Sequence, residues 1–345
     1  MPEKTAKVTI QDVAEQAGVS TATVSRMINK NGFVSAEAKE SIEAVIKTTG
    51  YNPTRRRRQS EITASALKHN NASLIWTTSQ EMQMSNSGRD LMLGLTEGLR
   101  DINASLNVDY IDSSGYIPHS LQNGSIDGVF IHGPAPRASM LRYLKKLPVV
   151  WLLQQGAKDY GDRVQPDHIH AGKIAAQHLL DQGCRQLCCI TTCSTTSDYT
   201  QTRSGAFIKL ANQHQVTTSV IEHSTHPPAE ATPSLRKAIA TEMAAAFAKL
   251  SPRPDGLFVA SEIGPYVHLE LTKLGIIPMK DVCMVAGDTN ICAQFPLSPI
   301  PVTIRIFSKK IGRQAVELLL QRIKNPDMPQ MTCLLKPQLE LPNAD

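Results

Sequence analysis

The stretch VTIQDVAEQAGVSTATVSRMIN, residues 8–29, decides how the chain begins to fold. Thr9 is placed to cap a helix, because Asp12 follows it at the spacing of a capping box. Gly18 ends this helix, and the tight turn Gly-Val-Ser leads into a second helix that Ser20 can cap. Two short helices joined in this way predict a helix-turn-helix.

The second helix has one apolar and one polar side. Val24, Met27 and Ile28 point inward, whereas the outer side carries small and polar residues, namely Thr21, Ala22, Ser25, Arg26 and Asn29. Small residues let a helix approach the major groove closely, where an arginine can reach guanine O6 and N7. A third helix follows Ser35 and ends at Gly50. The alternative is that these are three ordinary core helices of another kind of domain.

Positive charge is concentrated at the start of the chain. Residues 1–60 hold ten Lys and Arg against six Asp and Glu, a net charge of +4, whereas residues 61–345 hold 26 against 25. The whole chain has 345 residues and a net charge of +5, so almost all of the excess lies in its first sixth. A small basic module beside a neutral body is typical of a nucleic-acid-binding protein.

The first module resembles a known family of DNA-binding headpieces. VTIQDVAEQAGVSTATVSRMIN, followed by VSAEAKESIEAVIKTTGYNP, is similar almost without gaps from Val8 to Pro53 to the headpiece of the LacI family of bacterial regulators. The resemblance implies a headpiece over residues 1–53 in which base edges are read by Thr21, Ala22 and Arg26. It also implies that the phosphate backbone is held by Thr9, Ser20, Ser25, Asn29 and Tyr51.

The linker, residues 54–71, departs from the family pattern. It reads TRRRRQSEITASALKHNN, whereas in the family a short hinge helix follows the proline and places a leucine in the minor groove. Counted from Pro53 that position is Ser60, and counted back from the first core strand it is Leu67. About seven inserted residues and a hinge helix near residues 61–68 are therefore expected, with the register open between the two positions. The arginines are expected to contact phosphates or a narrow minor groove, or else to form a solvated linker: Arg55, Arg56, Arg57 and Arg58.

From residue 72 to 345, apolar strand-like runs alternate with amphipathic helices. Expected strands are SLIWT, VDYID, GVFIHG, PVVWLL, QLCCITT, SVIEH, GLFVAS and CMVAG. Expected helices include RDLMLGLTEGLRDI, AGKIAAQHLLDQG, ATEMAAAFAKL, YVHLELTKLG and SKKIGRQAVELLLQRI. This alternation predicts doubly wound parallel sheets, which bind ligands at the carboxyl ends of their strands.

Three segments of the core extend the resemblance. They are PDHIHAGKIAAQHLLDQGCRQL, RPDGLFVASEIGPYVHLELTKLGIIPMKDVCMVAGD and PVTIRIFSKKIGRQAVELLL. They are similar to the periplasmic-binding-protein-like sensor core of the same family, which has two lobes. The expected fold is therefore a small all-α headpiece followed by an α/β core of two doubly wound parallel-sheet lobes.

The resemblance also implies effector contacts between the lobes from Thr78, Ser79, Arg203, Ser261, Glu262 and Asp288. Asp288 follows a strand end at which the family keeps an acidic residue, and Arg203 matches an arginine that reaches into the cleft. Residues at strand ends can instead bond their own backbone. The first-lobe loop TTSQEMQMSNSGRD lacks the family's aromatic residue, so the candidates to stack on a ligand are Trp76, Trp151 and Tyr199.

Together these features predict a sequence-specific DNA-binding transcription regulator, in the family's usual role a repressor. Its expected partners are a double-stranded DNA operator, a small-molecule effector such as a sugar or related metabolite, and a second copy of the chain in a homodimer. A ligand that closes the lobes changes operator affinity only if it binds one state better than the other. The alternative is a constitutive DNA-binding dimer whose core binds no ligand, because a pocket needs convergent polar groups.

Other functions lack their sequence signals. We find no GxSxG, GxxxxGKS/T or HExxH motif and no GxGxxG after a strand, so neither an enzyme nor a cofactor is expected. His168 and His170 beside Asp167 lie at a helix start, where capping or ligand contact is favoured over acid-base chemistry. The four cysteines of GCRQLCCITTC, residues 183–193, lack zinc-site spacing, which argues against a metal site. Cys188 and Cys189 lie in the apolar run RQLCCITT and are expected to be buried thiols. No apolar run approaches the roughly 18 residues of a membrane span, and the odd number of cysteines favours a reducing, cytoplasmic compartment.

Overall fold

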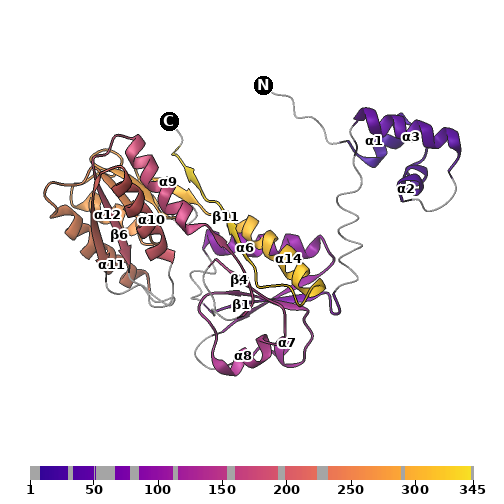
Figure 1. Cartoon of the computed structure of the whole chain (residues 1–345), viewed down its shortest axis with the longest axis horizontal. Coiled ribbons are helices and arrows are strands. Elements are labelled where there is room, and N and C mark those ends of the chain that lie inside the picture. Colours follow the sequence, from indigo (N-terminus) through magenta and orange to yellow (C-terminus); the bar gives the residue numbers. More distant parts are fainter. Residues whose placement is uncertain are drawn as a thin grey trace. The chain divides into compact units, whose positions relative to one another are not determined.

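The computed structural model describes residues 8–29, 34–49, 51, 67–77, 85–111, 116–153, 160–192, 199–223, 232–288 and 292–342. The chain divides into two compact units, Met1–Ser65 and Ala66–Asp345. In Figure 1 the first unit is a small helical module, and the second consists of two lobes in which helices cover a sheet. The expected fold class, an all-α headpiece and an α/β core, is confirmed.

The described part of the first unit contains α1 (Ile10–Gln16), α2 (Thr21–Asn29) and α3 (Ala36–Thr49). α1 begins at the predicted cap, because the Thr9 hydroxyl accepts the Asp12 N–H at 3.3 Å while the Asp12 carboxylate accepts the Thr9 N–H at 2.6 Å. These hydrogen bonds from Thr9 lower the pKa of the Asp12 carboxyl. α2 also has its predicted cap, since Ser20 Oγ accepts the backbone N–H of Thr23 at 3.1 Å.

The turn between α1 and α2 depends on Gly18. Its φ of +66° lies in the left-handed region, and the next residue, Val19, donates its N–H to the Ala14 carbonyl at 3.0 Å in a Schellman motif. The three helices close around a buried core of Val13, Ala14, Ala17, Val24 and Ile42. The predicted helix-turn-helix is present, and its core lies on the inward side of α2.

The first lobe is built on a six-stranded parallel sheet with strand order β11-β5-β4-β3-β1-β2. Its strands are β1 (Asn71–Trp76), β2 (Ser105–Tyr110), β3 (Gly128–His132), β4 (Val149–Leu152), β5 (Asp162–Pro166) and β11 (Thr332–Leu335). Its helices are α6 (Asn86–Arg100), α7 (His119–Gln122), α8 (Ala138–Leu144) and α14 (Ser308–Lys324). Figure 1 shows α6 and α14 side by side, and their apolar sides share one buried cluster with Leu74 and Phe130 of the sheet.

The second lobe repeats this winding, with strand order β12-β10-β9-β8-β6-β7. Its strands are β6 (Gln186–Thr192), β7 (Thr217–His223), β8 (Gly256–Val259), β9 (Cys283–Ala286), β10 (Val302–Arg305) and β12 (Gln338–Glu340). Its helices are α9 (His168–Asp181), α10 (Tyr199–Gln213), α11 (Pro233–Ala248) and α12 (Gly264–Lys273). Only the pairing of β12 with β10 is antiparallel among the described strand pairs.

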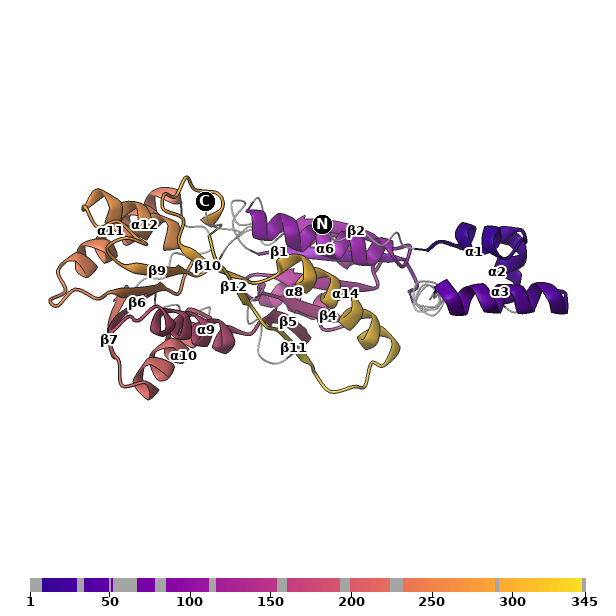
Figure 2. The same cartoon turned by 90° about the horizontal axis from the view of Figure 1, so that it is seen from above.

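The chain passes between the lobes after β5, after β10 and after β11. In Figure 2 the yellow C-terminal segment follows β11 in the first lobe and continues into β12 beside β10 of the second. At the second passage Phe307 has a left-handed φ of 58° immediately before α14. These passages join the lobes at the side of the molecule where the carboxyl ends of the strands meet.

Close approach of paired helices depends on glycine. In the first lobe a Cβ added to Gly94 of α6 would lie 2.1 Å from the carbonyl oxygen of Lys309 on α14. In the second lobe a Cβ added to Gly172 of α9 would lie 2.1 Å from the carbonyl oxygen of Arg203 on α10. A side chain at either position would force the two helices apart.

Asp127, immediately before β3, holds the chain where the core begins. Its carboxylate accepts the backbone N–H groups of Lys68 at 2.7 Å, His69 at 2.9 Å and Asn71 at 3.1 Å. Asp255 has the same place before β8 in the second lobe, where it accepts two backbone N–H groups of the segment that leads into β6. Each lobe thus uses one carboxylate to fix the entry to its central strands.

A buried ion pair fixes the C-terminal part of the first lobe. Arg322 of α14 donates to both oxygens of the Asp162 carboxylate, at 2.9 and 2.8 Å, and Asp162 is fully buried. These hydrogen bonds raise the pKa of Arg322. The same carboxylate accepts the Met331 N–H at 2.8 Å, so α14, β5 and the segment before β11 are held together.

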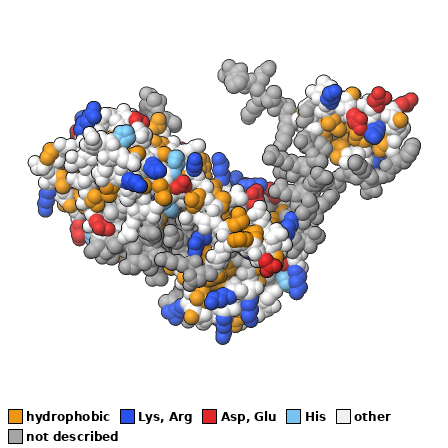
Figure 3. Space-filling view, viewed as in Figure 1, with side chains coloured by type: hydrophobic (Ala, Val, Ile, Leu, Met, Phe, Trp, Pro, Cys, Tyr) orange, Lys and Arg blue, Asp and Glu red, His pale blue; other side chains and the backbone are white. Residues whose placement is uncertain are grey.

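Figure 3 shows basic side chains, in blue, gathered at the edge of the first lobe that carries α8, where Arg137, Arg142, Lys145 and Lys146 are exposed. Cys188 and Cys189 are buried in β6, which confirms the expectation for these two thiols. Cys184 is buried as well, and Cys193 lies outside the described residues. Among the described residues no group of three or more His, Cys, Asp and Glu side chains is arranged to hold a metal ion. None of the described helices combines the length and the apolar composition that a membrane span requires.

Candidate functional site

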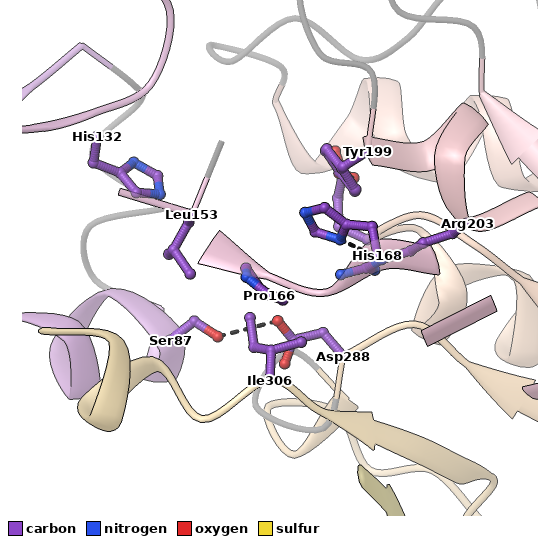
Figure 4. Close-up of a pocket in the computed structure, with 10 residues that line it drawn as sticks. Ser87, His132, Leu153, Pro166, His168, Tyr199, Arg203, Asp288 and Ile306 are labelled. Carbon is purple, nitrogen blue, oxygen red and sulfur yellow. Dashed lines mark hydrogen bonds between the residues drawn. The ribbon is translucent and has the colours of Figure 1, made fainter. Parts of the chain in front are cut away.

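A pocket lies between the two lobes, at the carboxyl ends of their strands. Its cavity volume is about 550 Å³, including the solvent at its mouth. Figure 4 shows the residues that line it, namely Ser87, His132, Leu153, Pro166, His168, Tyr199, Arg203, Glu262, Asp288 and Ile306. The doubly wound topology explains this position, because ligand sites of such sheets lie beyond the strand ends where the strand order reverses.

Both lobes and the passages between them contribute to the pocket wall. Ser87 lies in the first turn of α6, and His132 ends β3 in the first lobe. The second lobe supplies its polar groups from α9, from α10 and from the segments after β8 and β9. Pro166 ends β5, Ile306 follows β10, and both give the pocket an apolar part. The polar groups therefore converge from both sides on one cavity.

Arg203 is the buried cation of the site, with 4% of its surface exposed. Its Nε donates to His168 Nδ1 at 3.1 Å, and its Nη1 donates to the carbonyls of Ala260 and Gly287, both at 3.3 Å. The guanidinium also lies 5.1 Å from the ring centre of Tyr199. Burial lowers the pKa of Arg203, and the neighbouring Tyr199 and acidic groups oppose that shift. The hydrogen bonds fix the guanidinium against the end of the second sheet.

His168 is held in one tautomer by this arginine. Because the Arg203 N–H donates to Nδ1, Nδ1 carries no proton and the neutral ring must be protonated at Nε2. Nε2 is buried, and within the described ranges of the chain it has no hydrogen-bond partner. Burial first, and then repulsion by Arg203, lower the pKa of His168 to about 2. The ring is therefore neutral at physiological pH.

Tyr199 and Glu262 form a short hydrogen bond at the side of the pocket. The Tyr199 hydroxyl donates to Glu262 Oε2 at 2.6 Å, and the Tyr199 ring lies 5.5 Å from the ring of His168. Burial, and then the charge of Glu262, raise the pKa of Tyr199. The tyrosine therefore stays protonated and presents a ring face beside the polar groups.

One hydrogen bond joins the two lobes directly across the pocket. Ser87 Oγ donates to Asp288 Oδ2 at 3.2 Å, and both side chains are buried. The dashed line in Figure 4 marks this contact between α6 and the segment after β9. Asp288 thus lies close to the first turn of α6, where the helix dipole favours a negative charge.

The structure brings three of the expected effector contacts, Arg203, Glu262 and Asp288, into one pocket. Ser261 is different: it is buried after β8 and does not line the cavity, because the next residue, Glu262, is the one whose side chain reaches it. Thr78 and Ser79 lie outside the described residues. These two remain expectations.

Among the aromatic candidates, only Tyr199 lines the pocket. Trp76 and Trp151 are buried in the first-lobe core, because both belong to apolar strands that are covered on both faces. Sequence reasoning missed His132, a polar residue at the end of the apolar strand GVFIH. Burial lowers the pKa of His132 to about 4, and its ring lies 4.6 Å from that of Trp76. A histidine at the carboxyl end of a buried strand was the signal available for it.

In the headpiece, the three residues expected to read bases are exposed on α2: Thr21, Ala22 and Arg26. Thr9 and Ser20, expected to hold phosphates, are exposed and also cap α1 and α2. Ser25 is half-buried, and Tyr51 packs against the headpiece core. Asn29 ends α2, but its side chain is outside what the structure describes.

The linker is described only from Leu67 onward. Leu67, expected in a hinge helix with its side chain in a DNA groove, is not helical and packs against the first-lobe core. Its apolar side chain gains burial there, and the backbone of the next residue, Lys68, is held by Asp127. Ser60 and the arginine run Arg55, Arg56, Arg57 and Arg58 lie outside the described residues.

The comparisons with known families agree with this arrangement. Residues 9–54 match the model of bacterial regulatory proteins of the lacI family. Residues 90–226 match periplasmic binding proteins and the sugar binding domain of the LacI family, and residues 176–341 match a periplasmic binding protein-like domain. The chain belongs to the LacI family.

Relatives of this LacI-family protein match over nearly its whole length. It is 24% identical over 351 residues to the transcriptional repressor PurR of Photobacterium profundum, covering 96% of each chain. It is 25% identical over 357 residues to the ribose operon repressor of Escherichia coli K12, covering 96% of this chain and 98% of the other. These relatives are repressors of transcription rather than enzymes.

A solved structure of the lac repressor dimer, bound to operator and the anti-inducer ONPF, shares the fold of this LacI-family protein. The TM-score is 0.61 at 20% sequence identity, with 97% of this chain and 98% of that chain covered. The likeness extends over the headpiece and both lobes. It supports the two-lobed reading of the core.

Proposed function

We propose that the protein is a cytoplasmic, sequence-specific transcription repressor that binds a double-stranded DNA operator and responds to a small-molecule effector. The proposal rests on one observation: polar groups of both lobes converge in a single pocket, where Ser87 of the first lobe donates to Asp288 of the second. A ligand that contacts both lobes is bound with different strength when their separation changes. Such a difference is what a ligand needs in order to alter DNA affinity.

DNA recognition is assigned to the exposed side of α2. In this proposal base edges are read by Thr21, Ala22 and Arg26, which are exposed and free of the headpiece core. The phosphate contacts are Thr9, Ser20, Ser25, Asn29 and Tyr51, together with Arg55, Arg56, Arg57 and Arg58. One headpiece makes few contacts, so a homodimer on a pseudo-palindromic operator is proposed.

Exposed apolar side chains support a paired core. Strand β2, at the edge of the first sheet, carries Val108 and Tyr110, whose exposed fractions are 36% and 50%. Leu93 of the helix α6 is 46% exposed. The lac repressor to which the fold is similar was solved as a dimer on its operator. An edge strand with apolar side chains is a surface that natural proteins cover.

The effector is assigned to the pocket between the lobes, with contacts from Arg203, Glu262 and Asp288, and with Thr78 and Ser79 as further candidates. The wall offers carboxylates, hydroxyls and an imidazole N–H beside an apolar floor, the mixture that binds small polar molecules. One relative is a ribose operon repressor, which supports a sugar or a related metabolite as the effector.

Operator selection followed by binding measurements tests this function. Selection from random duplex DNA is expected to yield a pseudo-palindromic site. Arg26→Ala is expected to weaken binding to that site by roughly 10- to 100-fold and to relax the preference at one base pair in each half-site. Arg253→Ala, at an exposed position of the second lobe, is the control of equal charge change and is expected to bind like the unaltered protein.

Effector control is measured on the same site by adding sugars and related metabolites. A ligand that binds the core is expected to change operator affinity by roughly 5- to 150-fold. Retention of binding and base preference in Arg26→Ala would rule out the assigned DNA surface. Operator affinity that no ligand alters would count against a sensor role, and a core that binds none of the ligands would instead support the constitutive DNA-binding dimer.

A further inference from the structure

We propose that His168 determines which effectors the pocket accepts: its Nε2–H donates a hydrogen bond to an acceptor atom of the ligand, and the ligand is an uncharged molecule rather than an anion. The inference rests on the proposed function of the same pocket. It concerns a residue that was not among the effector contacts carried over from the family.

The first step is that Arg203 restricts the neutral imidazole of His168 to one tautomer. The guanidinium N–H occupies Nδ1 at 3.1 Å, so the imidazole presents a donor at Nε2 and cannot present an acceptor there. Rotation of the ring by 180° would place the Cδ2–H group, which accepts no hydrogen bond, against the Arg203 N–H. The arginine itself is fixed by the Ala260 and Gly287 carbonyls. The donor at Nε2 is therefore a permanent feature of the pocket wall.

The second step is that this donor lacks a partner among the residues that the structure describes. Nε2 is buried, and none of their acceptors lies in hydrogen-bond geometry with it. The backbone of Leu153 favours a proton on the ring but does not complete a hydrogen bond to Nε2. Buried donors without acceptors are destabilising and uncommon in native proteins. Because His168 lines the cavity in Figure 4, a ligand atom there can supply the acceptor.

The third step concerns charge. Among the described residues that line it, the pocket holds two carboxylates, Glu262 and Asp288, and one guanidinium, that of Arg203. Burial lowers the pKa of His168 to about 2 and that of His132 to about 4, so neither imidazole adds a positive charge at neutral pH. An anionic ligand would therefore meet more carboxylates than cations among these described side chains. An uncharged ligand with an oxygen or ring-nitrogen acceptor meets both conditions.

A structural role alone is the competing explanation, in which His168 serves only as an acceptor for Arg203. Two substitutions separate the roles. In His168→Asn the amide oxygen can take the place of Nδ1 as acceptor, but the donor at Nε2 is lost. In His168→Gln the amide nitrogen reaches the place of Nε2 and keeps the donor. His170→Asn, two residues along α9 and outside the pocket wall, is the matched control.

Titration calorimetry with the full chain tests the proposal. The probes are D-ribose, D-glucose and adenosine, each beside its anionic counterpart, D-ribose 5-phosphate, D-gluconate and adenosine 5′-monophosphate. We expect any probe that binds to be uncharged and to bind at least about tenfold more tightly than its counterpart. For that probe we expect His168→Asn to lose about 10- to 100-fold in affinity, His168→Gln to lose less than about fivefold, and His170→Asn to bind like the unaltered protein.

The possible outcomes are distinct. Equal or tighter binding of the anionic counterpart, or equal affinity of His168→Asn and the unaltered protein, overturns the inference and leaves effector control of DNA binding intact. Failure of all six probes to bind the unaltered protein removes the ligand-sensing function and the inference with it. A ring nitrogen spectrum gives a readout that does not depend on variants: a proton on Nδ1 of His168 at pH 7 would also overturn the proposal.

Discussion

Replacement of Gly172 by alanine tests whether the contact between α9 and α10 sets the position of the pocket arginine. A Cβ at this position would lie 2.1 Å from the carbonyl oxygen of Arg203, whereas ordinary van der Waals contact begins at 3.4 Å. The obstacle is backbone rather than the end of a flexible side chain. The new methyl group therefore forces α9 away from α10 and moves the residue that orients His168.

The magnitude follows from two opposing effects. Overpacking of a close-packed interior costs about 1–3 kcal/mol, and the rigid obstacle at Gly172 places the cost at the upper end of that range. Alanine favours a helix over glycine by about 1 kcal/mol. The net loss of unfolding free energy is about 2 kcal/mol, which lowers the melting temperature of a domain of this size by roughly 4–8 °C. Affinity for the effector is expected to fall as well, because Arg203 is displaced.

Gly205→Ala is the control on the same pair of helices. Gly205 lies on α10, is exposed and has no atom within 4 Å of an added Cβ. Only the helix preference then acts, and the melting temperature should rise by roughly 2–4 °C. Thermal unfolding of the three proteins, followed by circular dichroism, measures the difference. If Gly172→Ala is as stable as the unaltered protein, or if both variants shift in the same direction, the packing argument is refuted.

Two further variants probe buried charge. Arg322→Ala leaves the fully buried Asp162 carboxylate without its cation, so urea denaturation should show that the free energy of unfolding falls by about 3–5 kcal/mol. Lys324→Ala, at an exposed position nearby, is the control and should change that free energy by no more than about 0.5 kcal/mol. A small loss in Arg322→Ala would contradict the assignment of a buried ion pair. His132 has its pKa lowered from 6.5 to about 4 by burial, so the unfolded state takes up the proton first as the pH falls. Stability due to the neutral ring is complete above pH 6.5 and is lost between pH 6.5 and about 4, by about 1.4 kcal/mol per pH unit. His132→Asn should remove this pH dependence of the unfolding free energy, measured by denaturation curves at a series of pH values. His119→Asn, at an exposed position, is the control and should keep it. An unchanged pH dependence in His132→Asn would mean that another group titrates.

The sequence was most informative where a local pattern has one physical solution. The residues from Thr9 to Ser20 determine two caps and a left-handed glycine, and each of these was predictable because caps and tight turns depend on near neighbours in the chain. The strong apolar strands, such as β6, were predictable for the same reason. Four strands, β5, β10, β11 and β12, were not among those expected, because each is only three to five residues long. Such short runs acquire their strand form from pairing, β5 with β11 and β10 with β12.

The pocket was predictable only in part. Arg203, Glu262 and Asp288 follow from the resemblance, since they stand at or near strand ends. Ser87 was not recognised as part of the site, and His168 was expected either to cap a helix or to contact a ligand. What places them together is the meeting of two lobes that are distant in sequence. The Ser87 to Asp288 hydrogen bond joins residues that are 201 positions apart. No local pattern encodes a contact of that range.

Strand β3 links the two ends of the first lobe more directly than any loop does. At its start Asp127 holds the backbone of Lys68, His69 and Asn71, and at its other end His132 forms part of the pocket wall. Five residues of strand span about 17 Å, and a strand paired on both sides does not stretch. A displacement of the pocket end of β3 is therefore expected to reach residue 68, where Asp127 holds the backbone of the chain.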